Sequence, residues 1–90
     1  MPYATVYHPE VRKDIESLDH KQRKIISKAI DTPLRIEPAK YGKPVSGSLK
    51  GYWKLRVGDV RVVFKIVRNE LLILGIIHRK MVYEKIFKRL

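Results

Sequence analysis

The fold is decided by one stretch of the sequence, which reads Tyr52-Trp53-Lys54-Leu55-Arg56-Val57-Gly58-Asp59-Val60-Arg61-Val62-Val63-Phe64. Apolar and polar side chains alternate on both sides of Gly58-Asp59. Such a pair between two alternating runs is typical of a β-hairpin with a two-residue loop. Because the loop fixes the pairing of the strands, we expect Val57 to face Val60 and Arg56 to face Arg61.

The two faces of this hairpin differ in character, because successive side chains of a strand point to opposite faces. The apolar face, which we expect to pack against helices, receives Trp53, Leu55, Val57, Val60, Val62, Phe64 and Ile66. The opposite face, termed the basic face, receives Tyr52, Lys54, Arg56, Arg61, Val63 and Lys65.

The basic face places like charges directly opposite one another. An arginine pair such as Arg56 and Arg61 destabilises a sheet, and a purely structural surface would mix the two signs of charge. The basic face is therefore expected to bind an anionic partner, and Tyr52 offers a ring on which a base could stack. The alternative is a solvated sheet face whose long side chains extend into water.

The residues before the hairpin predict one strand and a helical hairpin. Residues 3–7 alternate and are rich in β-forming residues, so we expect a short strand. Two helices follow, and Asp19 and Gln22 form the capping-box pattern that begins the second. We expect their inward residues to be Val11, Ile15 and Leu18 in the first helix and Ile25, Ile26, Ala29 and Ile30 in the second. Pro33 limits the second helix, and residues 33–51 are expected to be loop because they are rich in proline and glycine.

The residues after the hairpin complete the predicted sheet. Residues 71–77 are apolar at nearly every position, as in a strand that is covered on both faces. Residues 78–90 form a basic tail that could be a short helix with Val82, Ile86 and Leu90 on one side. The predicted fold class is α+β: an N-terminal strand, a helical hairpin, an antiparallel three-stranded meander in one sheet, and the tail. Residues 1–90 are expected to form a single small domain.

Charge is the most informative feature of the composition. The chain of 90 residues has 20 Lys and Arg against 9 Asp and Glu, which gives a net charge of +11. Asp59 is the only acid between Glu37 and Glu70, a stretch that contains Lys40, Lys43, Lys50, Lys54, Arg56, Arg61, Lys65 and Arg68. Such a surplus is typical of a protein that binds a polyanion: nucleic acid, an anionic membrane or an acidic protein. The alternative is a solvated basic surface adapted to a salty or hot cytoplasm.

Several classes of protein are excluded by composition. The chain contains no cysteine, which excludes disulfides and thiolate metal sites. No apolar run approaches the roughly 20 residues that span a membrane, and the first residues lack the pattern of a signal peptide. We therefore expect a cytoplasmic protein without a membrane-spanning segment, and no membrane is expected among its partners.

The residues available for catalysis are mainly cations and a phenol. The sequence has no Gly-rich phosphate loop, no paired carboxylates and no metal-ligand spacing, and His8, His20 and His78 are scattered. Cations and a phenol suit phosphodiester cleavage of RNA, because the ribose 2′-OH is an internal nucleophile next to the phosphorus. The protein then has to orient the RNA, neutralise developing charge and move protons. No metal or other cofactor is expected.

Two motifs carry a resemblance to a known family. They are K-L-R-x-G-x-x-R at residues 54–61 and H-R-x-x-x-Y at residues 78–83, with the loop-like segment 42–51 upstream. At this separation the pair resembles the RelE toxins of bacterial and archaeal toxin–antitoxin systems. The resemblance covers the whole chain in length and in the order of its elements.

The resemblance implies an RelE-like fold and a metal-independent endoribonuclease, an mRNA interferase that cleaves ribosome-bound mRNA by 2′-OH attack and so inhibits translation. The family's catalytic positions match Lys54, Arg61, Arg79 and Tyr83. Lys54 would take the 2′-OH proton or bind phosphate, Arg61 would hold the scissile phosphate, Arg79 would assist the leaving oxygen, and Tyr83 would orient the nucleotide. RNA or phosphate binding is further expected of Tyr52, Arg56, Lys50 and Lys65.

The resemblance also implies partners and leaves alternatives open. The expected partners are the ribosome, its mRNA and an acidic, RelB-like antitoxin that wraps the toxin, and a toxin–antitoxin heterotetramer is the expected assembly. Well-studied members carry a second lysine where this chain has Tyr52, so the general base is open. A sister branch, the ParE toxins, inhibits DNA gyrase without cleaving RNA, and a plain RNA-binding domain is a third possibility. Among single residues, Trp53 is expected in the core, and His78 is expected to make a structural hydrogen bond.

Overall fold

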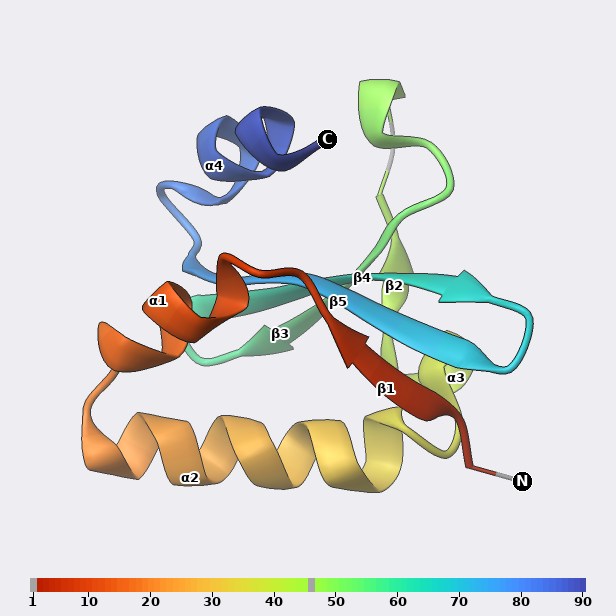
Figure 1. Cartoon of the computed structure of the whole chain (residues 1–90), viewed down its shortest axis with the longest axis horizontal. Coiled ribbons are helices and arrows are strands. Elements are labelled where there is room, and N and C mark those ends of the chain that lie inside the picture. Colours follow the sequence, from red (N-terminus) through yellow and green to blue (C-terminus); the bar gives the residue numbers. More distant parts are fainter. Residues whose placement is uncertain (1, 46) are drawn as a thin grey trace.

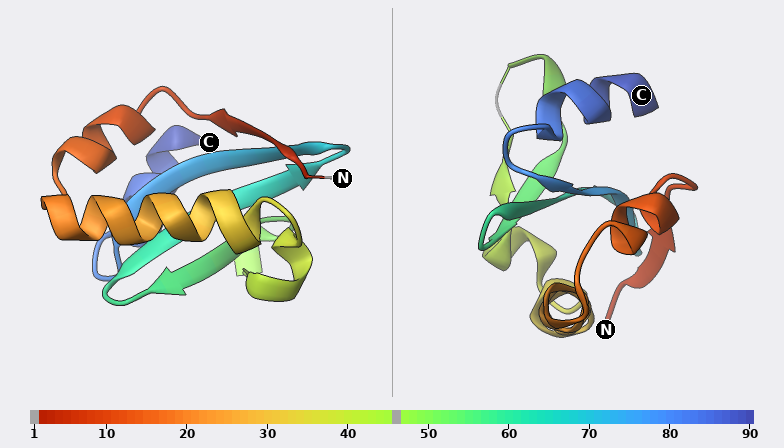
Figure 2. Two further views of the ribbon diagram at one scale, coloured as in Figure 1. Left: turned by 90° about the horizontal axis from the view of Figure 1, so that it is seen from below. Right: turned by 90° about the vertical axis from the view of Figure 1, so that its left-hand side faces the viewer.

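The computed structural model describes residues 2–45 and 47–90. A five-stranded sheet has helix α2 on one side and helix α4 on the other, and helix α1 lies beside the edge of the sheet, next to β5 (Figures 1 and 2). The strands are β1 (Ala4–Tyr7), β2 (Lys43–Pro44), β3 (Trp53–Val57), β4 (Val60–Val67) and β5 (Glu70–His78). The helices are α1 (Val11–Glu16), α2 (His20–Ala29), α3 (Pro38–Tyr41), the 3-10 turn η2 (Gly47–Leu49) and α4 (Val82–Arg89). Between α2 and α3 lies the kinked segment η1 (Ile30–Leu34), in which Thr32 has an extended backbone. None of these helices, within the described part of the chain, is long and apolar enough to cross a membrane.

The strand order is β1-β5-β4-β3-β2, with β1 parallel to β5 and the other neighbours antiparallel. The predicted N-terminal strand, helical hairpin and β3–β4–β5 meander are confirmed. The register of the hairpin is also as expected, with Val57 opposite Val60 and Arg56 opposite Arg61. Gly58 adopts a φ of 60° in the loop, a left-handed conformation that suits the first loop position of a type II′ turn.

The first hydrophobic core lies between the sheet and helices α1 and α2. The apolar face of the hairpin supplies Val60, Val62 and Phe64 as buried residues, and the rest of that face packs against them. Trp53 belongs to this core, as expected, and its ring stacks on Phe64 with 6.4 Å between centroids. The capping box of α2 is confirmed as well, because the Asp19 side chain accepts a hydrogen bond from the Gln22 backbone N–H and the Gln22 side chain accepts one from the Asp19 backbone N–H.

The prediction is wrong for two of the residues expected to point into the core. Ile15 is 38% exposed and Ile25 is 49% exposed. In the first helix, the buried stripe runs from Val11 through Asp14 to Leu18, so an acid takes the position that periodicity alone gives to an isoleucine. This exchange is possible because Asp14 has a buried partner, described below.

The second hydrophobic core lies on the basic face, beneath α4. It combines residues of the segment before β3, of the sheet and of α4: Val45, Leu49, Val63, Leu74, Ile77, Val82 and Ile86. Strand β5 therefore has apolar cover on both faces, as predicted. The basic face is not uniformly solvated, since α4 covers its apolar centre. The tail is helical as suggested, but Leu90 lies beyond the end of α4 and is 58% exposed.

The prediction of a continuous loop over residues 33–51 is wrong. Helix α3 begins with Pro38 at its first position, where proline is tolerated. Strand β2 is a pair of residues in which Lys43 lies opposite Lys54 and Pro44 opposite Trp53. These elements are too short to produce a periodic pattern, so the sequence shows only the proline and glycine residues that separate them. Their effect is to extend the sheet by one edge strand beside the basic face.

Candidate functional site

A hollow of about 220 Å³ opens on the basic face, between α4, the sheet and the segment before β3. It is lined by Val45, Leu49, Lys54, Arg61, Val63, Arg79, Val82, Tyr83 and Ile86. We term this hollow the cationic groove. All four residues predicted to be catalytic line it, although they come from β3, β4, the turn after β5 and α4.

The cationic groove has an apolar floor and a basic rim. The floor consists of residues of the second core, whereas the rim carries Lys54, Arg61 and Arg79. Charges beside an apolar floor act in a medium of lowered dielectric constant, so they attract an anion more strongly than they would in bulk water. No acidic residue lines the groove, and no group of three metal-ligating side chains occurs in the part of the chain that the structure describes. The groove is suited to hold a phosphate group.

Lys54 and Tyr83 meet across the groove. The Lys54 Nζ atom donates a hydrogen bond to the Tyr83 hydroxyl at 3.4 Å, which connects β3 to α4. The distance is long for such a bond, and Tyr83 is 47% exposed. The phenol ring is therefore both accessible to a ligand and held near the amine.

Arg61 is held in place by the hairpin loop. Its NH1 atom donates to the carbonyl of Gly58 at 2.9 Å and to that of Val60 at 3.1 Å. These two bonds offset part of the repulsion from Arg56 on the opposite strand. The Nε and NH2 atoms make no hydrogen bond within residues 2–45 and 47–90, so they are available to an oxyanion. A guanidinium that is already ordered loses less freedom when it binds a ligand.

Arg79 is linked to the same loop. Its backbone N–H donates to the Asp59 carbonyl at 2.8 Å, and its Nε lies 3.8 Å from the Asp59 carboxylate in an exposed ion pair. Such a pair orients the side chain more than it stabilises the fold. The predicted structural role of His78 is confirmed, because its Nδ1 atom accepts a bond from the Lys80 backbone at 3.2 Å. The turn that leads into α4 is thereby fixed.

The other residues predicted to bind RNA or phosphate lie outside the cationic groove. Tyr52 is half-buried against the second core, and the Lys65 Nζ atom lies 5.3 Å from the centroid of its ring. Neither residue lines the cationic groove, and one face of the Tyr52 ring already has a cation beside it. Lys50 is exposed and also lies off the groove. Arg56 lines a neighbouring hollow, to which we return below.

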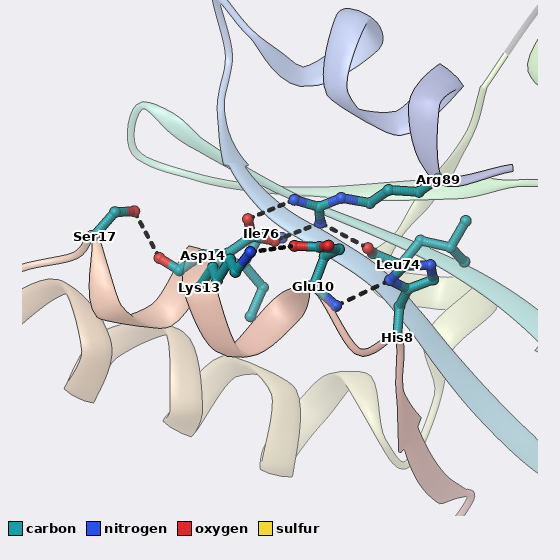
Figure 3. Close-up of polar contacts among 8 residues, drawn as sticks. All are labelled: His8, Glu10, Lys13, Asp14, Ser17, Leu74, Ile76 and Arg89. Atoms are coloured by element: carbon teal, nitrogen blue, oxygen red, sulfur yellow. Dashed lines mark hydrogen bonds and ion pairs between the residues drawn. The ribbon is translucent and has the colours of Figure 1, made fainter.

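Helix α4 is fixed to the body of the protein by an ion pair that sequence reasoning missed (Figure 3). The Arg89 side chain donates to both carboxylate oxygens of Asp14 on α1, at 2.6 and 2.7 Å. Asp14 also accepts from the Ile76 backbone, and Arg89 also donates to the Leu74 carbonyl. Both side chains are more than nine-tenths buried, and the hydrogen bond from Arg89 to Asp14 raises the pKa of the guanidinium. The sequence contained one signal of this buried ion pair, which was the aspartate between Val11 and Leu18 on an apolar stripe.

This ion pair takes the place of a missing strand at the edge of β5. Strand β1 ends at Tyr7, opposite Ile73, so β5 extends beyond its parallel neighbour. The register between β4 and β5 also shifts by one residue between Val63 and Phe64, which leaves Leu74 as a bulge. Asp14 and Arg89 bond to backbone atoms in this region. The position of α4, and with it that of Tyr83, depends on these contacts.

Comparison with known proteins identifies the family. A family model described as "ParE toxin of type II toxin-antitoxin system, parDE" matches residues 5–83. The toxin–antitoxin complex RelBE2 of Mycobacterium tuberculosis contains a chain that is 26% identical, with a TM-score of 0.82 over 88% of this chain and 100% of that one. For the RelE-RelB complex of Pyrococcus horikoshii the identity is 25% and the TM-score 0.68, over 88% of this chain and 97% of that one.

The free toxin RelE of Escherichia coli, solved as a mutant, has the same fold. Its TM-score is 0.77 at 15% identity, over 100% of this chain and 99% of that one. A comparison with curated protein sequences gives no match. The resemblance to RelE toxins seen in the two motifs is thus confirmed at the level of the superfamily. The chain belongs to the ParE toxin family of type II toxin–antitoxin systems, within the RelE/ParE superfamily.

Proposed function

We propose that this toxin is a metal-independent mRNA interferase that cleaves ribosome-bound message and so arrests translation. The observation that supports it most directly is the convergence of Lys54, Arg61, Arg79 and Tyr83 on one groove. Two separate sequence motifs supply these residues, and a protein without phosphate chemistry has no need to bring three cations together around an apolar floor.

The proposed reaction begins at the ribose. Lys54 accepts the 2′-OH proton as the oxygen attacks the adjacent phosphorus, or, if another group is the base, it binds the phosphate. Its hydrogen bond to the Tyr83 hydroxyl joins the amine to the residue that orients the nucleotide. The exposed Tyr83 ring is available to stack on a base.

The two arginines act on the phosphorus centre. Arg61, held by the loop carbonyls, uses its remaining N–H groups to bind the scissile phosphate and stabilise the pentacovalent state. Arg79 neutralises the charge that develops on the leaving 5′-oxygen. Attack by the 2′-OH forms one P–O bond while the bond to the 5′-oxygen breaks. The products are a 2′,3′-cyclic phosphate and, once the leaving oxygen has taken up a proton from water, a 5′-hydroxyl. Arg56, beside Arg61, supports the phosphate site.

The proposal includes an antitoxin partner and a cytoplasmic site of action. The RelBE2 and RelE-RelB structures are toxin–antitoxin complexes. We expect the partner of this chain to be acidic, because the net charge of +11 favours fast and oriented association with an acidic protein. It should cover the cationic groove or contact residues 78–90. A complex in which the antitoxin touched neither region would contradict this expectation.

A second candidate is inhibition of DNA gyrase without RNA cleavage. The observation that favours it is the match of the ParE family model to residues 5–83. In that case the basic face would bind a protein or DNA surface, and loss of Lys54 or Tyr83 would be tolerated.

Pulse labelling separates the two candidates in the cell. The toxin is expressed without its partner, and incorporation of labelled amino acids and of labelled thymidine is followed in parallel. The proposed function predicts that protein synthesis stops first and that an Arg79→Ala variant does not stop it. If DNA synthesis stopped while protein synthesis continued, the gyrase candidate would replace this proposal.

A further inference from the structure

A second hollow adjoins the cationic groove, and sequence reasoning did not predict it. Its volume is about 360 Å³, and it is lined by Tyr41, Lys43, Lys54, Leu55, Arg56 and Arg61. We term it the edge hollow because it lies where β2 ends beside β3. Lys54 and Arg61 line both hollows, so they form the ridge between them.

The edge hollow is strongly basic because neighbouring strands place cations directly opposite one another in two pairs. Lys43 of β2 lies opposite Lys54 of β3, and Arg56 of β3 lies opposite Arg61 of β4. Each such pair opposes strand pairing. Lys43 does not line the cationic groove, so the reaction proposed there gives no reason for a cation at this position. A ligand in the edge hollow would give one.

The rim of the edge hollow adds an exposed aromatic ring. Tyr41 ends α3 and is 42% exposed, and the Lys40 Nζ atom lies 5.5 Å from its ring centroid. A large exposed aromatic among cations is the combination that binds single-stranded nucleic acid, in which the cations follow the phosphates and the ring stacks on a base. Among the residues that the structure describes, no acidic side chain lines the hollow.

From these contacts we propose that the edge hollow is a second nucleotide subsite of the toxin, which binds the RNA nucleotide next to the one in the cationic groove. The RNA strand crosses the ridge of Lys54 and Arg61. The neighbouring phosphate lies against Lys43 and Arg56, and its base stacks on Tyr41. This inference rests on the proposed function, because it takes RNA as the ligand of the groove.

The test measures binding of a fluorescent 2′-O-methyl tetranucleotide, which lacks the nucleophilic hydroxyl, by fluorescence anisotropy at several salt concentrations. The test variants are Lys43→Gln and Tyr41→Ala. The matched controls are Lys28→Gln on α2 and Tyr7→Ala on β1, because Lys28 and Tyr7 are also exposed and line neither hollow.

We expect Tyr41→Ala to weaken binding about tenfold, the effect of losing one stacked base. Lys43→Gln should weaken it and reduce the slope of log affinity against log salt by about 0.7, as for one lost phosphate contact to a single strand. Its melting temperature should be unchanged or higher, because the substitution removes a like-charge pair. The two control variants should bind like the wild type.

Two outcomes would overturn the subsite. In the first, Lys43→Gln and Tyr41→Ala bind the tetranucleotide as tightly as the controls do. In the second, Tyr41→Ala and Lys43→Gln weaken binding of a glutamate-rich peptide but not binding of the tetranucleotide. This result would make the hollow a site for an acidic protein.

Cleavage of ribosome-bound message by the wild type, measured on the same preparations, reports separately on the proposed function. If the wild type cleaves message but Tyr41→Ala and Lys43→Gln bind the tetranucleotide normally, only the proposed subsite is wrong. If the wild type does not cleave message but these two substitutions weaken tetranucleotide binding, only the proposed nuclease activity is wrong.

Discussion

Asp14 of α1 and Arg89 of α4, which lie 75 residues apart in the chain, form a doubly hydrogen-bonded ion pair with nitrogen–oxygen distances of 2.6 and 2.7 Å. The pair is buried between α1, the first helix of the chain, and α4, the helix that carries Tyr83. The second core and this ion pair together hold α4 over the basic face. The shape of the cationic groove is therefore determined partly by residues outside it.

The ion pair predicts a large stability effect when one partner is lost. Arg89→Met leaves the Asp14 carboxylate buried without its cation, and we expect it to lower the free energy of unfolding by about 3–5 kcal/mol. Replacing both partners in Asp14→Leu/Arg89→Met removes the unpaired charge, so part of the stability should return. The recovery should be incomplete, because the Ile76 N–H and the Leu74 carbonyl then lose their side-chain partners. Urea unfolding, followed by the fluorescence of Trp53, measures both variants.

The control for this prediction is Arg12→Met. Arg12 pairs with Glu16 at 3.6 Å on the surface of α1, where such a pair contributes little. If Arg89→Met were no less stable than Arg12→Met, the ion pair would not be what holds α4.

A second way to move α4 is to add a methyl group at Gly75 of β5. A Cβ atom at this position would lie 2.7 Å from Ile77 Cδ1, and 2.9 Å from both Arg89 NH1 and Ile86 Cδ1. Gly75→Ala should therefore push α4 away from the sheet and cost about 1–3 kcal/mol, as is usual for overpacking. Adding Ile86→Val should recover part of the loss. An unchanged melting temperature of the single variant would show that the Ile77, Ile86 and Arg89 side chains move aside without displacing α4.

Binding of RNA should weaken steeply with salt. Each phosphate neutralised on a single strand contributes about 0.7 to the slope of log affinity against log salt, and three cations line the cationic groove. Arg79→Ala should therefore reduce that slope by about 0.7, whereas Lys21→Gln on α2 should leave it unchanged. Titration of a 2′-O-methyl tetranucleotide over a range of salt concentrations measures the slope. A slope that is flat in the wild type would mean that the groove does not contact phosphate.

The hairpin could be predicted in detail because its determinants are local. The loop Gly58-Asp59 sets the register, and alternation then assigns each side chain to a face. The grouping of Lys54, Arg61, Arg79 and Tyr83 was predicted only through the resemblance to RelE toxins, because their proximity depends on how α4 packs.

Other features could not be predicted because they depend on distant partners. The burial of Asp14 requires Arg89, and the bulge at Leu74 is specified by the pairing of two strands. The edge hollow was missed because α3 and β2 are short, and nothing in the sequence places Lys43 opposite Lys54.

The structure also changes what is expected of Arg61→Ala. From the sequence, loss of Arg61 only relieves repulsion with Arg56, so that stability is unchanged or higher. The two hydrogen bonds from Arg61 to the loop carbonyls are lost as well, and we now expect a small decrease in stability, of the order of 1 kcal/mol or less. Thermal unfolding of the variant, compared with Arg56→Ala, measures the difference. A clear gain in stability would show that the loop bonds contribute nothing.

The most direct test of the central claim is cleavage of ribosome-bound message by the wild type, Arg61→Ala and Arg79→Ala, with the chemical ends of the products determined. The proposed function predicts fragments with a 2′,3′-cyclic phosphate and a 5′-hydroxyl from the wild type. It predicts rates about 100- to 1000-fold lower for each variant, the usual effect of removing one group that stabilises a transition-state oxyanion, in proteins that remain folded. Wild-type rates in either folded variant, or products that carry a 3′-hydroxyl, would contradict it.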